Sequence, residues 1–166
     1  MIRAINVSMV FALWIPLLVG ATTCEQAELV EALPYQAPVV DSGSNDIRAN
    51  NAENCVSASY YGGNEALLRF TAGFSGEVSV AYQGQSWTAV VVYAGCPTSG
   101  GSCVGGVASS ATSKSLVVDV EAGQEYFILV DTWPSPISPV PGVITIEGQT
   151  LPDPIFFDGF EGLPDR

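Results

Sequence analysis

The side chains able to do chemistry in this chain of 166 residues include four cysteines and 17 acids, while histidine is absent. Without histidine, neither a Ser-His-Asp triad nor a Cys-His pair can form. A serine–lysine dyad is missing too, because Ala111 lies three places before Lys114, the only lysine. Two carboxylates from distant parts of the chain could meet for glycoside hydrolysis, but with 17 acids such pairings arise by chance. We therefore predict a protein that is not an enzyme and keep a carboxylate-dependent hydrolase as a remote alternative.

The four cysteines are Cys24, Cys55, Cys96 and Cys103. An even number of cysteines in an exported chain is typical of disulfides. Cys96 and Cys103 bracket the turn-forming sequence PTSGGS, so we expect them to pair with each other and to leave Cys24 for Cys55. A zinc site would need four thiolates from scattered positions without a C-x-x-C spacing, so the sequence predicts no metal there.

Several aromatic residues could form a platform for sugar rings, namely Trp87 and Trp133 together with Tyr60 and Tyr61. Trp133 follows Asp131 closely and opens the sequence WPSPISPVPG, whose prolines stiffen the loop and could present the indole outward. Trp133, Trp87 and Asp131 are therefore the candidate ligand-binding residues. The competing interpretation is that the aromatic side chains pack in the core or anchor loops.

Three acids, Asp119, Glu121 and Asp131, could supply oxygen ligands to calcium. The D-x-D-x-D-G pattern is absent, and solvated acids on strand faces explain these residues more simply. We predict no cofactor, with calcium binding as a weak alternative.

The chain is strongly acidic, with a formal net charge of −12. A field of that sign repels phosphate groups, so the charge disfavours nucleic acid and anionic membrane surfaces as partners. Solubility alone would explain the charge. The partners left are an extracellular protein or a polysaccharide.

Residues 1–21 have the layout of a secretory signal peptide. Arg3 precedes an apolar run over residues 7–19, and small residues up to Ala21 offer a cleavage site. The apolar run is shorter than the roughly 20 residues that cross a bilayer. We expect cleavage after Ala21, no membrane span in the mature chain, and a location in the periplasm, at the cell surface or in the medium.

Two other fates of the N-terminus are weighed against cleavage. One is an uncleaved N-terminal anchor, and the other is a lipoprotein acylated at Cys24. Ala21 and Thr23 do not fit the usual residues before a lipidated cysteine, and acylation would leave an odd number of thiols. We therefore favour cleavage.

Alternating apolar and polar residues predict short strands beyond residue 55, and turn-forming glycines and prolines separate them. Regularly spaced strands without helical patterns predict an all-β fold, an antiparallel β-sandwich or jelly roll forming a single domain. The segments 95–106 and 134–142 are expected to be loops, and residues 27–33 one or two helical turns. The predicted strands cover residues 68–71, 77–82, 88–93, 116–120, 126–131 and 143–147.

The chain is accordingly divided into four parts: a signal peptide (1–21), an irregular lead-in (22–54), the sandwich domain (55–148) and an acidic tail rich in proline and phenylalanine (149–166).

Three stretches in order, RFTAGFSGEVSV, TAVVVYAGCPTSGGSC and SLVVDVEAGQEYFILVD, resemble the bacterial pre-peptidase C-terminal domain. The resemblance covers residues 52–147 and implies a secreted, non-catalytic β-sandwich of a kind usually attached to exported enzymes or surface proteins. Many relatives carry an Asn/Asp cluster after the second cysteine, where this chain has Val104, Gly105 and Gly106. That departure argues against a calcium or polar-ligand role for this loop.

The tail sequence DPIFFDGFEG resembles a short I-F-x-D-G-F-E element of exported proteobacterial proteins. Phe156, Phe157 and Phe160 either dock on a sheet edge as an added strand or form a sorting tag.

The leading hypothesis is an exported, non-catalytic interaction domain that acts at the cell surface or outside the cell and binds protein or polysaccharide. The alternative is a small carbohydrate-binding module centred on Trp133 and Trp87.

Overall fold

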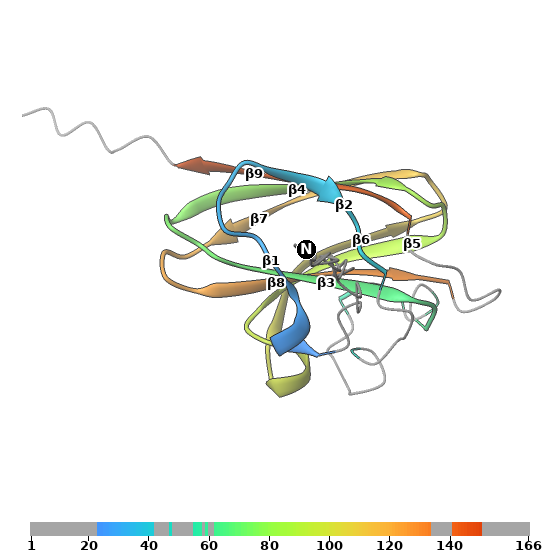
Figure 1. Cartoon of the computed structure of the whole chain (residues 1–166), viewed down its shortest axis with the longest axis horizontal. Coiled ribbons are helices and arrows are strands. Elements are labelled where there is room, and N and C mark those ends of the chain that lie inside the picture. The colour runs from blue at the N-terminus through green and yellow to red at the C-terminus, as the bar shows by residue number, and fades with distance from the viewer. Residues whose placement is uncertain are drawn as a thin grey trace, which may run out of the picture.

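The structure, a computed structural model, describes residues 23–41, 47, 55–57, 59, 62–133 and 141–150. Two sheets lie face to face (Figure 1), and neighbouring strands are antiparallel except for the parallel pair β1 and β3. The predicted all-β antiparallel sandwich is therefore confirmed. The larger sheet has the order β1 (Glu28–Leu29), β3 (Glu65–Thr71), β8 (Glu125–Thr132), β5 (Thr88–Ala94) and β6 (Ser102–Ser109). The smaller sheet has the order β2 (Tyr35–Pro38), β9 (Gly142–Thr150), β4 (Gly76–Gly84) and β7 (Ser113–Val120).

The main core lies between the two sheets. Every second residue of each central strand points inward, as the period-two alternation predicted. These side chains are almost completely removed from water, which is the chief stabilising contribution to such a fold. They include Leu68, Phe70, Val78, Val80, Tyr82, Val90, Val92, Tyr126, Ile128, Val130, Ile144 and Ile146.

A second core covers the outer face of the larger sheet. All residues from Thr88 to Tyr93 in β5 and from Tyr126 to Thr132 in β8 are buried, so these strands are covered on both faces. Their nearly continuous apolar sequences, TAVVVY and EYFILVDT, agree with this environment. The outward-facing members, such as Val91, Tyr93 and Leu129, pack against Ile47 and the four cysteines.

The lead-in forms part of this cover and is not irregular throughout. It holds a short 3-10 turn, η1 (Cys24–Gln26), followed by β1 and β2, so the helical turns predicted over residues 27–33 are wrong. Tyr35–Pro38 pairs with β9 from Val143 to Ile146. Hydrogen bonding to a distant strand thus outweighs the local turn preference of this proline-containing segment.

The predicted loop over residues 95–106 is wrong in its second half. A 3-10 turn, η3 (Pro97–Ser99), is followed directly by β6, which pairs with β5. The glycines in β6 were interpreted as turn residues, but they provide room for close packing. A Cβ on Gly106 would come within 2.8 Å of Val56, and a Cβ on Gly105 within 2.7 Å of Val118.

Candidate functional site

Two tryptophans meet at the surface where β4 turns into β5 and where β8 ends. Trp87 is 49% exposed and Trp133 is 36% exposed. Their ring centroids are 5.6 Å apart and the ring planes make an angle of 66°. The structure therefore brings together two of the three residues that the sequence singled out as ligand-binding candidates.

Strand register explains why the two tryptophans are neighbours. Thr88 lies opposite Thr132 in the antiparallel pair β5 and β8, so the residue before Thr88 and the residue after Thr132 face each other. The backbone N–H of Trp133 donates to the carbonyl oxygen of Trp87 at 3.0 Å, which extends the ladder by one bond. Both threonines are buried, so the pair projects from a buried end of these two strands.

The backbone of Trp87 is in the left-handed region, with φ at +56°. A bulky residue rarely adopts this conformation, and it costs of the order of 1 kcal/mol or more unless the surrounding structure enforces it. Strained residues of this kind concentrate at functional sites. Here the left-handed turn directs the chain from the Gln85–Ser86 segment into β5.

The hydroxyl of Tyr82 connects the two chain segments that lead to the tryptophans. It donates to the carbonyl oxygen of Pro141 at 2.7 Å, just before β9, and accepts from the backbone N–H of Gln85 at 2.9 Å, in the β4–β5 turn. The ring itself is buried in the main core. Gly142 is required beside it, because a Cβ there would lie 2.5 Å from the Tyr82 ring.

Lys114 on β7 also binds the β4–β5 turn. Its ammonium group donates to the carbonyl oxygens of Gln85, at 3.3 Å, and Ala111, and lies 5.6 Å from the centre of the Tyr82 ring. The residue is only 4% exposed. Burial lowers the pKa of Lys114, and burial raises the pKa of Tyr82 against the opposing effect of its hydrogen bond from Gln85. We call Tyr82 and Lys114 the bracket below.

Asp131 is placed in the interior, away from the tryptophan surface. It is fully buried and lies opposite Glu65 and Ala89 in the neighbouring strands. Its Oδ1 atom accepts from the backbone N–H groups of Thr132, at 2.6 Å, and Gly62, at 3.4 Å. Asp131 therefore shapes the end of β8 and does not belong to the exposed surface.

The same burial bears on the calcium alternative. Asp119 and Glu121 are exposed at one end of β7 in the smaller sheet, whereas Asp131 is inside the larger sheet. Among the residues that the structure describes, no three His, Cys, Asp or Glu side chains are grouped closely enough to hold a metal ion. Nor does the described part contain a helix long and apolar enough to cross a membrane.

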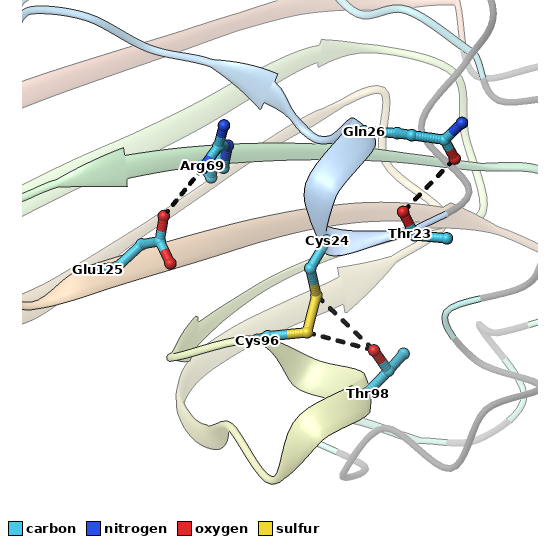
Figure 2. The surroundings of a disulfide bond; sticks show 7 residues. All are labelled: Thr23, Cys24, Gln26, Arg69, Cys96, Thr98 and Glu125. Carbon is cyan, nitrogen blue, oxygen red and sulfur yellow. Dashed lines mark hydrogen bonds and ion pairs between the residues drawn. A yellow bond between two sulfur atoms is a disulfide. The ribbon is translucent and has the colours of Figure 1, made fainter.

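The disulfide pairing differs from the prediction. Cys24 is bonded to Cys96, shown in Figure 2, and Cys55 is bonded to Cys103. The short loop between Cys96 and Cys103 folds as η3 and enters β6, so both cysteines face the segments that cover the larger sheet. Each bond therefore fastens part of the covering layer to the sheet.

A pocket of about 210 Å³ lies at the opposite end of the sandwich, near the start of β4. Its walls are mainly apolar, formed by Val30, Leu33, Phe70 and Phe74, and among the described residues that line it Glu31 alone is charged. This lining offers chiefly apolar packing surface.

Several predicted features lie outside the described residues. They are the signal peptide, the loop over residues 134–140, Tyr60 and Tyr61, and the tail with Phe156, Phe157 and Phe160. The roles expected for them remain predictions.

No protein-family model matches the sequence, and no curated protein matches it. Among solved structures, the chain is similar to the periplasmic inhibitor of g-type lysozyme from Aeromonas hydrophila, with a TM-score of 0.43 at 13% identity over 73% of this chain and 96% of that one. A carbohydrate-binding module of Cellvibrio mixtus lichenase 5A, solved with cellotriose, has a TM-score of 0.39 at 14% identity over 68% and 97%.

A third similar structure is the pre-peptidase C-terminal domain of a collagenase from Bacillus anthracis, with a TM-score of 0.46 at 8% identity. The similarity covers 73% of this chain and 94% of that domain. That domain belongs to the family whose sequence pattern residues 52–147 resemble.

Proposed function

We propose that this protein is an exported, non-catalytic binding domain that recognises an extracellular polysaccharide or protein through the surface formed by Trp87 and Trp133. One observation carries the proposal, which is that two large aromatic rings in contact stay partly in water on backbone segments joined by a hydrogen bond. Covering such rings with a partner is favourable, and because they are already ordered, little conformational entropy is lost. Tryptophans in this situation commonly dominate binding energy.

The surroundings of the pair support a role in binding without catalysis. Two ionisable side chains are connected with the pair: Lys114, which donates to the carbonyl oxygens of Gln85 and Ala111, and Asp131, two residues before Trp133, which is fully buried. A general acid or base must reach the reacting atom. Neither of these two side chains is exposed enough to do so.

Export is supported by two independent features. Residues 1–21 have the pattern of a signal peptide, and all four cysteines are in disulfides, which persist in oxidising compartments. The proposed place of action is the periplasm, the cell surface or the medium.

A polysaccharide is the better of the two partner classes. The exposed surface is formed by indole rings, whose faces suit the C–H faces of pyranose rings, and the chain offers few cations with which to hold acidic proteins. The specific function that we propose is therefore that of a carbohydrate-binding module.

Intrinsic fluorescence provides the direct test. The chain has three tryptophans, and Trp14 lies within the predicted signal peptide, so in the mature protein every indole belongs to this site. Titration of residues 22–166 with soluble β-glucan, xylan and chitin oligomers is expected to shift the emission for at least one of them. Gelatin, an extended polypeptide, is titrated in parallel as the protein probe.

The matched control is a substitution elsewhere on the surface. Trp133→Ala is expected to weaken binding roughly tenfold or more, as for a central aromatic contact. Val117→Ala, which removes a 59% exposed apolar side chain from β7 in the other sheet, is expected to leave binding unchanged. No emission change with any probe, or binding that Trp133→Ala does not alter, would contradict the proposal.

A further inference from the structure

We infer that the Trp87–Trp133 pair is a corner that receives a single sugar ring, at a chain end or in a short oligosaccharide, and that the bracket of Tyr82 and Lys114 fixes the angle of this corner. The inference rests on the proposed function and specifies its ligand. The observations are the geometry of the two rings and the hydrogen bonds behind them.

The ring planes make an angle of 66°, so both indoles cannot lie flat against one extended surface. A planar array of sugar rings, as on a crystalline polysaccharide, could stack on one indole only and would meet the edge of the other. A single pyranose ring can instead stack on one face while the edge of the second indole limits it at the side. The centroid distance of 5.6 Å keeps both indoles within reach of that one ring.

The backbone of both tryptophans fixes the positions from which the two indoles project. The hydrogen bond from Trp133 N–H to Trp87 carbonyl joins the two residues directly, and the left-handed conformation of Trp87 turns its side chain out of the strand direction. Rotation of either ring about its own side-chain bonds would separate the edge-to-face contact. The corner therefore depends on the position of the β4–β5 turn.

The bracket fixes the position of that turn through hydrogen bonds to its backbone. Lys114 and Tyr82 both bind Gln85, two residues before Trp87, through its carbonyl oxygen and its N–H group respectively. The hydroxyl of Tyr82 also binds Pro141, at the start of β9. Thr88 adds a bond from its hydroxyl to the carbonyl of Gln85 at 3.2 Å. Tyr82 and Lys114 are too buried to touch a ligand, so they act as positioning residues.

The charge of the protein further limits the ligand. With a net charge of −12, the molecule repels polyanionic glycans, and the single lysine that lies near the corner is directed at carbonyl oxygens. The ligand class is therefore a saccharide without acidic groups whose terminal ring has an apolar face, and a neutral oligosaccharide is the simplest member of that class.

The first experiment measures the corner itself, without a ligand. Two indoles at this distance should give an exciton couplet in the far-ultraviolet circular dichroism spectrum, and Trp133→Phe should abolish it. Tyr82→Phe, which keeps the ring in the core, and Lys114→Met, which keeps the apolar stem, are expected to reduce the couplet. Lys114→Arg should restore part of it. An unchanged couplet in both folded variants would overturn the positioning role of the bracket, and if Lys114→Met does not fold, Tyr82→Phe decides the question.

The second experiment measures affinity against ligand length by fluorescence, using neutral oligosaccharides from two to six rings and the corresponding insoluble polymer. A corner that holds one ring predicts a dissociation constant that stays constant, within about a factor of two, once the terminal ring is present. It also predicts no retention on the flat polymer. Trp87→Ala and Trp133→Ala should each remove most of the binding, because both walls are needed.

The outcomes separate the inference from the proposed function. Affinity that rises steadily with chain length, or retention on the flat polymer, would overturn the corner while leaving a carbohydrate-binding function in place. Binding of gelatin and of no saccharide would overturn the corner and leave a protein-binding function. Binding of no probe would contradict the proposed function together with the inference.

Discussion

Trp87 combines an exposed indole with a backbone conformation that costs free energy. A residue selected for stability alone at φ of +56° would be glycine, which has no Cβ, or asparagine, which adopts this region more readily than other residues. The presence of tryptophan indicates that the side chain at this position matters more than the strain.

This trade-off can be measured by comparing two truncations. Trp87→Gly and Trp87→Ala remove the same indole, but only glycine relaxes the left-handed backbone. Trp87→Gly is therefore expected to be more stable than Trp87→Ala by about 1 kcal/mol in chemical denaturation, while both lose ligand binding. Equal stability of the two variants would show that the turn carries no strain at this residue.

Tyr35 predicts a specific loss of stability in alkali. Its hydroxyl donates to Glu28 Oε1 at 2.5 Å, and burial, then this hydrogen bond and the charge of Glu28, raise the pKa of Tyr35 well above its usual value. Above about pH 10 the unfolded chain releases the tyrosine proton while the folded protein keeps it. The free energy of unfolding must therefore fall as the pH rises above about 10. The stabilising contribution of the Tyr35 hydroxyl is fully present below about pH 10.

The measurement is chemical denaturation between about pH 9 and pH 11.5, in the protein and in Tyr35→Phe. The variant should lose part of the downward slope above about pH 10. Tyr82 contributes a slope of the same sign, and Lys114, whose pKa is lowered, contributes the opposite sign below its ordinary value of 10.5. Both are present in both proteins, so the difference between the two curves isolates Tyr35, and identical slopes would contradict the assignment.

At the scale of elements, the covering layer over the larger sheet is the least expected part of the fold. Antiparallel sheets commonly leave one face in water, yet β3, β5 and β8 are buried on both faces. The cover consists of η1, Ile47 and the segment at Cys55 and Val56, which offer few strand-to-strand hydrogen bonds. Covalent bonds to Cys96 and Cys103 compensate for that deficit.

Removal of a disulfide should therefore loosen the cover more than the sandwich. The bonds close loops with sequence separations of 72 and 48 residues, which corresponds to about 4 kcal/mol each in the chain-entropy model. In the double variant Cys55→Ser with Cys103→Ser, hydrogen exchange should increase first for residues that contact the cover, such as Val91 and Leu129. Residues of the smaller sheet, such as Val80 and Ile146, are the internal control, and an equal increase there would show that the two layers unfold together.

The packing of β6 against the cover gives a second test at this scale. A Cβ on Gly106 would be 2.8 Å from Val56 and 3.2 Å from Cys55, so Gly106→Ala should destabilise by about 1–3 kcal/mol through overcrowding. Gly73→Ala is the matched control, because its Cβ would meet no atom within 4 Å. Thermal denaturation of the two variants measures the difference, and similar melting temperatures would contradict this packing.

At the scale of the whole molecule, export and disulfide pairing can be checked together. Proteolysis of the secreted protein without reduction, followed by mass spectrometry, should recover one linked peptide pair containing Cys24 and Cys96 and another containing Cys55 and Cys103. The mature chain should begin after Ala21. A Cys96–Cys103 peptide would contradict the structure, and a lipid-modified Cys24 would place the protein on a membrane and leave Cys96 without its bond.

Much of the fold could be predicted because its information is local. Alternation in Val78, Val80 and Tyr82, or the continuous run from Thr88 to Tyr93, reflects the environment of a single strand, and each such strand was found. The predictions failed for segments whose structure depends on residues far away in the chain. β2 exists because β9 lies beside it, and β6 because its glycines let the Cys55 segment and β7 approach.

The sequence by itself determined an acidic, all-β domain with four cysteines, no histidine and two tryptophans beyond residue 21, since composition and periodicity do not depend on long-range contacts. Only the tertiary structure decided which cysteines pair, that Asp131 is enclosed, and that Trp87 and Trp133 form one surface. These facts depend on the register of β5 with β8 and on what covers the outer face of the larger sheet. Register and layer packing are set by the sum of many contacts between residues far apart in the chain, and no short stretch of sequence contains that sum.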